Sequence, residues 1–113
     1  MITVYQIKLA NDQINLAAQE AKLNVMLGAS NFRISDLRYY TETMKVDTDD
    51  LEEAFELTNL WDQPARVTRF GSGQSSTSVG DIFQKGERFY MVDSFGFAFL
   101  TLFNDEVEML QAA

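Results

Sequence analysis

The chain has 113 residues, of which 46% are hydrophobic, and a net charge of −8. This length is typical of one domain with its own core, so we expect a single domain over residues 1–113. There is no histidine and no cysteine, which excludes Ser-His-Asp and Cys-His catalysis, disulfide bonds and cysteine metal sites. No apolar run approaches the roughly 20 residues of a membrane helix and no secretory signal opens the chain, so we expect a cytoplasmic protein without membrane contact.

The first half of the chain predicts a strand, a helix and a second strand. Residues 2–9 are rich in β-branched and aromatic side chains, although their alternation is imperfect, and a strand is favoured. Asn11 or Asp12 can cap a helix whose apolar residues recur at helical spacing and which Gly28 can end. After an irregular connector, a strand is expected from about residue 38 to residue 46.

Acidic side chains gather in one segment. Residues 47–63 contain seven acidic residues and no basic one, so they carry −7 of the net charge. Asp49 is expected to cap a helix here, with Glu52 in a capping-box relation, and Asn59 is expected to end it. Its buried stripe is expected to comprise Leu51, Ala54, Phe55 and Thr58.

The second half predicts a long loop followed by a hairpin. Residues 60–77 hold the only proline and the only tryptophan and read as a loop. The sequence then predicts two strands, over residues 77–83 and 87–93, which are joined by a turn around Lys85-Gly86. Beyond them phenylalanines alternate with small residues, which favours a strand whose bulky face is core rather than an exposed edge, and the tail is expected to form one helical turn or to fray. The alternating phenylalanines are Phe95, Phe97 and Phe99.

These elements predict the fold class. We expect a small single α+β domain with a mixed or antiparallel sheet of about four to five strands, including a C-terminal hairpin, packed by two helices.

The acidic helix and the tryptophan are the candidate partner-binding residues. Because no lysine or arginine lies among the seven acids, the segment cannot form the i,i+4 ion pairs that usually support a solvated helix. Docking of a basic partner and a merely solvated helix face are therefore about equally favoured. Tryptophan in a loop beside a proline is typical of interface anchors. The candidate residues are Asp49, Asp50, Glu52, Glu53, Glu56 and Trp61.

Two other function classes stay open. An acidic nucleic-acid mimic that occupies a DNA- or RNA-binding protein would need carboxylates spread over a wide face, including those of the tail. An enzyme would use Asp81 and Asp93, facing each other across the hairpin, to hold a divalent metal. Both aspartates are also ordinary turn formers, and this interpretation is favoured.

Several separated motifs form one pattern: "DLEEAFELTN" (50–59), "SVGDIF" (78–83), Gly86, Tyr90, Val92-Asp93 and Gly96-Phe97. This pattern, an acidic helix followed by a hairpin, resembles the YodL-like domain and related small proteins of bacteriophages and other mobile elements, and the resemblance covers about residues 39–97. The family often has a histidine and a large apolar residue just before its Ser-Val, where this chain has Ser75 and Thr77.

The resemblance implies a small accessory protein without known catalytic residues. It also implies that Asp93 and Gly96 set a turn, here called the corner (residues 93–96), and that Phe97 fills the core. Our leading hypothesis is a non-catalytic, phage-encoded module that binds and modulates or inhibits a host protein, as in host takeover or anti-defence. We expect no cofactor, no metal and no direct nucleic-acid contact; the partner would be a host protein with a basic surface, and a homodimer is left open.

Overall fold

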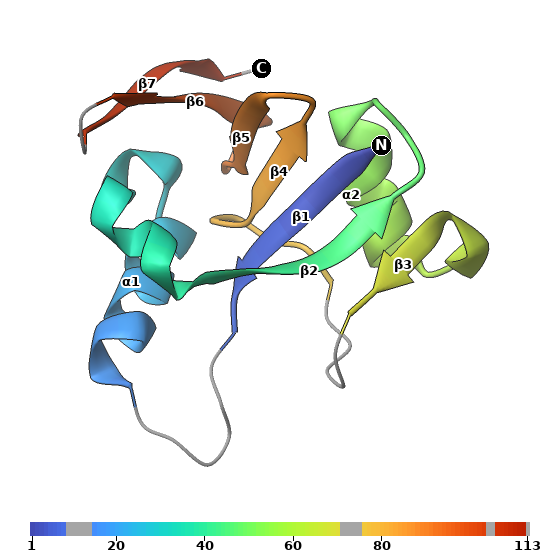
Figure 1. The fold of residues 1–113 in the computed structure, drawn as a ribbon, viewed down its shortest axis with the longest axis horizontal. Helices are drawn as coiled ribbons and strands as arrows, with labels where there is room; N and C mark the ends of the chain where they lie inside the picture. Colours follow the sequence, from blue (N-terminus) through green and yellow to red (C-terminus); the bar gives the residue numbers. More distant parts are fainter. Residues whose placement is uncertain (9–14, 71–75, 104–105, 113) are drawn as a thin grey trace.

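A computed structural model describes residues 1–8, 15–70, 76–103 and 106–112, with side chains described up to residue 100. It confirms an α+β domain with one antiparallel sheet in the order β3-β2-β1-β4-β5-β6-β7 (Figure 1). Among these residues, no helix is long and apolar enough to cross a membrane. The strands are β1 (Ile2–Ile7), β2 (Tyr40–Val46), β3 (Val67–Arg69), β4 (Ile82–Lys85), β5 (Arg88–Val92), β6 (Phe97–Phe103) and β7 (Glu106–Ala112). The helices are α1 (Leu16–Met26), α2 (Leu51–Leu60) and three short 3₁₀ helices, η1 (Ala29–Asn31), η2 (Ile34–Tyr39) and η3 (Pro64–Arg66).

The sheet is larger than expected because two further strands join its ends. β3 lies inside the expected loop and pairs with the last three residues of β2. β7 replaces the expected helical turn or frayed tail and pairs with β6. Acidic and apolar residues alternate from Glu106 to Met109, a period of two that suits a strand better than a helix.

A β-bulge interrupts the alternation of β2. Val4 pairs with Met44 but Tyr5 pairs with Glu42, so Thr43 is an extra residue in β2. Consequently Thr43 and Met44 are both buried although they are neighbours.

The core is divided between the two faces of the sheet. Ile82 and Phe83 are consecutive in β4 and belong to different buried clusters, and so do Met91 and Val92 in β5. Because consecutive strand residues point to opposite faces, each cluster occupies its own face. The α2 cluster comprises Ile2, Val4, Met44, Val46, Ala54, Leu57, Val67, Phe83, Val92 and Phe97, and the α1 cluster comprises Ile7, Ala21, Val25, Ala29, Phe32, Ile82, Met91, Ala98 and Leu100.

The helix N-termini differ from the expected ones. Asn15 caps α1, since its side chain accepts a hydrogen bond from the Ala18 backbone N–H at 3.0 Å. The expected caps Asn11 and Asp12 lie outside the described residues. The expectation that Asp49 caps α2 is wrong by one residue: Asp50 Oδ1 accepts from the N–H groups of Glu52 and Glu53.

The cap assignment can be tested with adjacent aspartates. Asp50→Ala should lower the free energy of unfolding by about 1 kcal/mol, because two N–H groups at the helix start lose their acceptor. Asp49→Ala should cost less, because Asp49 only forms an exposed ion pair with the N-terminal ammonium. Urea unfolding of both variants measures the difference, and equal losses would contradict the assignment.

Candidate functional site

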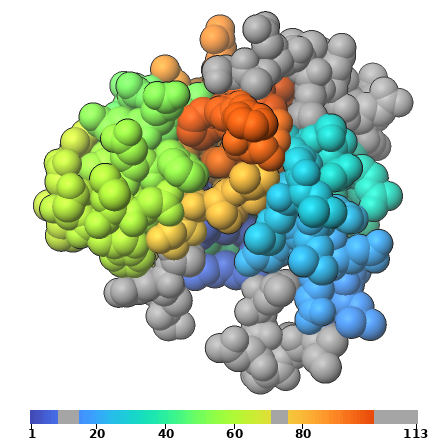
Figure 2. Space-filling view, turned by 180° about the vertical axis from the view of Figure 1, so that it is seen from behind, coloured from blue at the N-terminus to red at the C-terminus, as the bar shows by residue number. Residues whose placement is uncertain are grey.

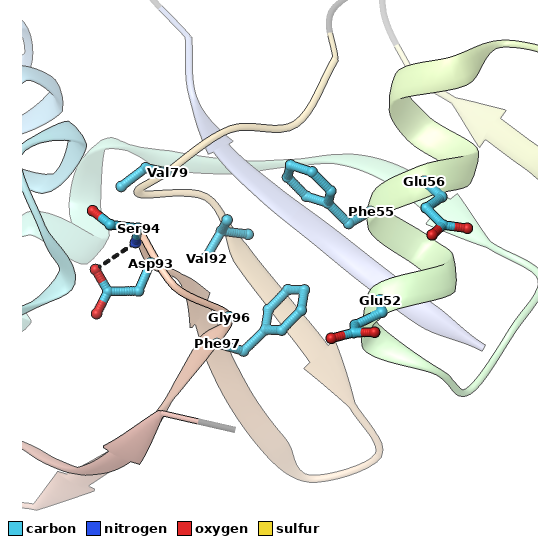
Figure 3. A pocket seen from close by; sticks show the side chains of 9 residues that line it. All are labelled: Glu52, Phe55, Glu56, Val79, Val92, Asp93, Ser94, Gly96 and Phe97. Carbon is cyan, nitrogen blue, oxygen red and sulfur yellow. Dashed lines mark hydrogen bonds between the residues drawn. The ribbon is translucent and has the colours of Figure 1, made fainter.

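A groove of about 340 Å³ lies between α2 and the corner (Figure 3). Its lining combines apolar side chains with carboxylates from both sides. The space-filling view shows the corner residues beside α2, with the segment that leads into β4 below them (Figure 2). The lining residues are Glu52, Phe55, Glu56, Val79, Val92, Asp93, Ser94, Gly96 and Phe97.

One face of α2 forms the acidic wall of the groove. Glu52, Phe55 and Glu56 occupy positions i, i+3 and i+4, which places their side chains next to one another. Figure 3 shows the Phe55 ring pointing from α2 into the space between the helix and the corner. The ring centroids of Phe55 and Phe97 are 6.5 Å apart at an interplanar angle of 81°. Within the described part of the chain, no ion pair engages the carboxylate of Glu52 or Glu56.

The corner forms the opposite wall, and its geometry confirms the expected turn. The Asp93 N–H donates to the Gly96 carbonyl at 2.9 Å, and Gly96 has φ +85°, a conformation that favours glycine. Asp93 Oδ1 accepts from the N–H groups of Ser94 and Ala29. This places Phe97, which is 5% exposed, in the floor of the groove and in the α2 cluster.

The three phenylalanines near the corner do not share one environment. Phe95 is 89% exposed because it belongs to the turn and not to a strand. Phe97 is buried and Phe99 is partly buried, with its ring 5.4 Å from that of Tyr90. The expectation of a buried bulky face therefore fails at Phe95.

A second hollow adjoins the groove at the start of α2. It has a volume of about 560 Å³ and shares Glu52 and Phe97 with the groove. Lys85 is the one basic residue in the lining of either hollow. The acidic lining includes Asp49 and Asp50, so carboxylates border both hollows along α2.

The five candidate acids fall into two groups: three take part in contacts at the start or the back of α2, and two line the groove. Asp50 is the helix cap and Asp49 pairs with the N-terminal ammonium, whose hydrogen bond to its carboxylate lowers the pKa of Asp49. Glu53 faces away from the groove lining and pairs with Arg66 at 2.7 Å. Hydrogen bonds from Thr48 and Arg66 lower the pKa of the Glu53 carboxyl. The groove therefore contains only Glu52 and Glu56 of the five.

Trp61 lies at the other end of α2, outside the groove lining. Its indole N–H donates to Ser76 Oγ at 3.1 Å, and the Arg69 guanidinium carbon lies 3.7 Å from its ring centroid. The residue is 40% exposed. Intramolecular contacts thus already engage both its polar edge and one face.

Asp81 and Asp93 do not face each other across the hairpin. The backbone of Val92 bonds to Gly80 and Asp81, and the two carboxylates have different partners. Asp81 Oδ2 accepts from the Gln6 side chain and the Ser78 N–H, both at 2.9 Å. Among the described residues, no group of three or more acidic side chains could hold a metal ion.

Asp81 belongs to a buried polar cluster behind the groove. The carboxyl is 8% exposed, and burial raises its pKa to about 6 against the hydrogen bonds from Gln6 and Ser78 and the charge of Lys22. Gln6 Oε1 accepts from Thr43 Oγ1 at 2.8 Å, which gives the bulge residue of β2 a partner. The cluster ties the segment before β4 to β1 and β2.

The tail acids lie away from α2. β6 runs from Phe97, which packs near α2, to Phe103, and Glu106 and Glu108 pair with Phe103 and Thr101. At about 3.3 Å per residue, these pairing positions are roughly 13 to 20 Å along β6 from Phe97. The backbone therefore does not favour one continuous acidic face built from α2 and the tail.

Sequence reasoning missed the apolar side of the groove. The sequence predicts Phe55 only as a core residue, whereas its ring also lines a surface groove together with two glutamates. The spacing of Glu52, Phe55 and Glu56 was a usable signal, since it places an aromatic ring and two carboxylates on one helix face. Comparison with protein-family models, with curated proteins and with solved structures finds no match to this chain.

Proposed function

We propose that the chain is a non-catalytic protein-binding module whose groove accepts a basic segment of a partner protein. The observation that carries this proposal is the position of Glu52 and Glu56 beside the apolar floor of the groove. An apolar floor with charges at its rim is the usual anatomy of a protein interface. The suggested setting, from the sequence resemblance, is the cytoplasm of a bacterial host in which a phage protein modulates or inhibits a host protein.

Charge complementarity supports a basic partner. Residues 47–63 carry −7. Among the described lining residues, the groove has no basic side chain and the adjoining hollow has only Lys85. Carboxylates without an intramolecular partner can pair with incoming lysine or arginine and raise the rate of association. In the part of the chain that the structure describes, Glu52 and Glu56 form no ion pair, whereas Glu53 already pairs with Arg66.

A pull-down from nuclease-treated host lysate tests the proposal. The double variant Glu52→Gln and Glu56→Gln should lose the partner that the unchanged chain captures at low salt, because two groove carboxylates become neutral. High salt should release the same partner from the unchanged chain. Mass spectrometry of the captured proteins measures both effects.

The matched control removes two charges elsewhere. Glu20 on α1 and Glu87 in the β4–β5 turn are exposed, and neither lines the groove. Their double change to glutamine should leave the captured partner in place. If both double variants captured the partner equally well, the groove would not be the binding site. If both lost the partner equally, binding would depend only on the net charge of the chain.

A further inference from the structure

We propose that the groove is selective for arginine, so that one arginine side chain of the partner lies against Phe55 with its guanidinium group next to Glu52 and Glu56. This inference rests on the proposed function and names the group that the groove recognises. It follows from the joint presence of an aromatic ring and two carboxylates on one helix face. An acidic surface alone would accept lysine and arginine alike.

The side chains around Phe55 suit a guanidinium group. A guanidinium is planar, stacks on aromatic faces and donates hydrogen bonds in a fork that matches carboxylates. Glu52 and Glu56 lie one helical turn apart and line the groove together with Phe55, so a planar cation against the ring has carboxylates beside it. Lysine presents a compact, strongly hydrated charge and gains less from the ring.

The size of the groove fits one long side chain. Its volume of about 340 Å³ lies near the lower end of the range for small-ligand pockets. The floor contains Val79, Val92 and Phe97, which can cover the methylene groups of an arginine. A whole helix or strand of the partner would instead contact only the rim of the groove.

The back of the same helix shows the pairing that we propose. Arg66 Nη2 donates to Glu53 Oε1 at 2.7 Å and to the Asp47 carbonyl at 2.9 Å. A glutamate of α2 thus already binds an arginine of this chain. Glu52 and Glu56 offer the same chemistry in the groove, whose lining also contains an aromatic ring.

Two peptides of equal length and charge test the selectivity. Fluorescein-labelled (Gly-Arg)₄ and (Gly-Lys)₄ would be titrated with the full chain at low ionic strength, and fluorescence anisotropy would measure Kd. The arginine peptide should bind roughly five- to tenfold more tightly, as expected for stacking on a partly desolvated ring. Phe55→Leu should remove this preference while both peptides still bind, because the two carboxylates remain.

Charge variants separate this inference from the proposed function. The Glu52→Gln and Glu56→Gln double variant should weaken both peptides, and the Glu20→Gln and Glu87→Gln control should weaken neither. Equal Kd values for the two peptides, still dependent on Glu52 and Glu56, would overturn arginine selectivity and leave the basic-partner proposal standing. Kd values unaffected by the groove variants would overturn both. Circular dichroism of each variant confirms that it is folded.

Discussion

Gly80→Ala should lower the free energy of unfolding by about 2 to 5 kcal/mol, which is a large part of the stability of a small domain. A Cβ at this position would lie 2.6 Å from Cγ2 of Val25 and 3.2 Å from its backbone carbonyl carbon. Gly80 also has φ +97°, where an L-residue is strained. The change would push α1 away from the start of β4, and urea unfolding measures the loss.

Gly86→Ala provides the matched control. Gly86 has φ +61°, but nothing lies within 4 Å of a Cβ added there. Gly86→Ala should therefore lower the free energy of unfolding only by the cost of the strained backbone, about 1 to 2 kcal/mol. Combining Gly80→Ala with Val25→Ala should recover part of the loss, because the clashing methyl groups are removed. Equal losses at the two glycines would refute the close contact between α1 and β4.

Local sequence signals were sufficient where an element is decided by its own residues. The hairpin turn at Gly86 follows from turn chemistry. The corner at Gly96 and the buried position of Phe97 are what the family resemblance implies, and the structure has both. β3 has only three residues, and it pairs with β2 across a distance in sequence that no local pattern reveals. The bulge at Thr43 likewise depends on how β1 and β2 align.

The sequence predicts which segment contains the candidate site, but it does not predict which side chains of that segment lie together on the surface. The charge count identified the acidic helix, yet it could not separate Glu52 and Glu56 from Glu53. That division depends on the corner, about 40 residues later in the chain, and on Arg66, which occupies the other side of α2. Trp61 is a candidate because of its residue type and its position in a loop beside a proline, whereas its contact with Arg69 follows from the position of β3.

The chain should lose stability as the pH rises from about 4 to about 6, through the ionisation of Asp81. Burial raises the pKa of this carboxyl from 3.8 to about 6, so the folded state holds the proton more tightly than the unfolded state. Below pH 4 both states are protonated, and above pH 6 the folded state contains a buried charge. The difference between the two pKa values corresponds to about 3 kcal/mol.

Asp81→Asn should remove this loss from the pH profile. Both hydrogen bonds go to Oδ2, so the single amide oxygen of asparagine can accept from Gln6 and from Ser78. The free energy of unfolding, measured in urea at pH 4.5 and pH 7, should therefore change less in the variant than in the unchanged chain. An identical difference in both proteins would contradict the assignment to Asp81.

Glu53→Gln supplies a control of opposite sign. Hydrogen bonds from Thr48 and Arg66 lower the pKa of Glu53, so its contribution is present at neutral pH and is lost as the pH falls through its folded pKa. Removing this carboxylate should make the chain less sensitive to acid, whereas removing Asp81 should make it less sensitive to rising pH. Asp81 accepts a hydrogen bond from Ser78, next to Val79 in the groove lining. The ionisation of Asp81 should therefore affect the position of this part of the groove floor as well as the stability of the fold.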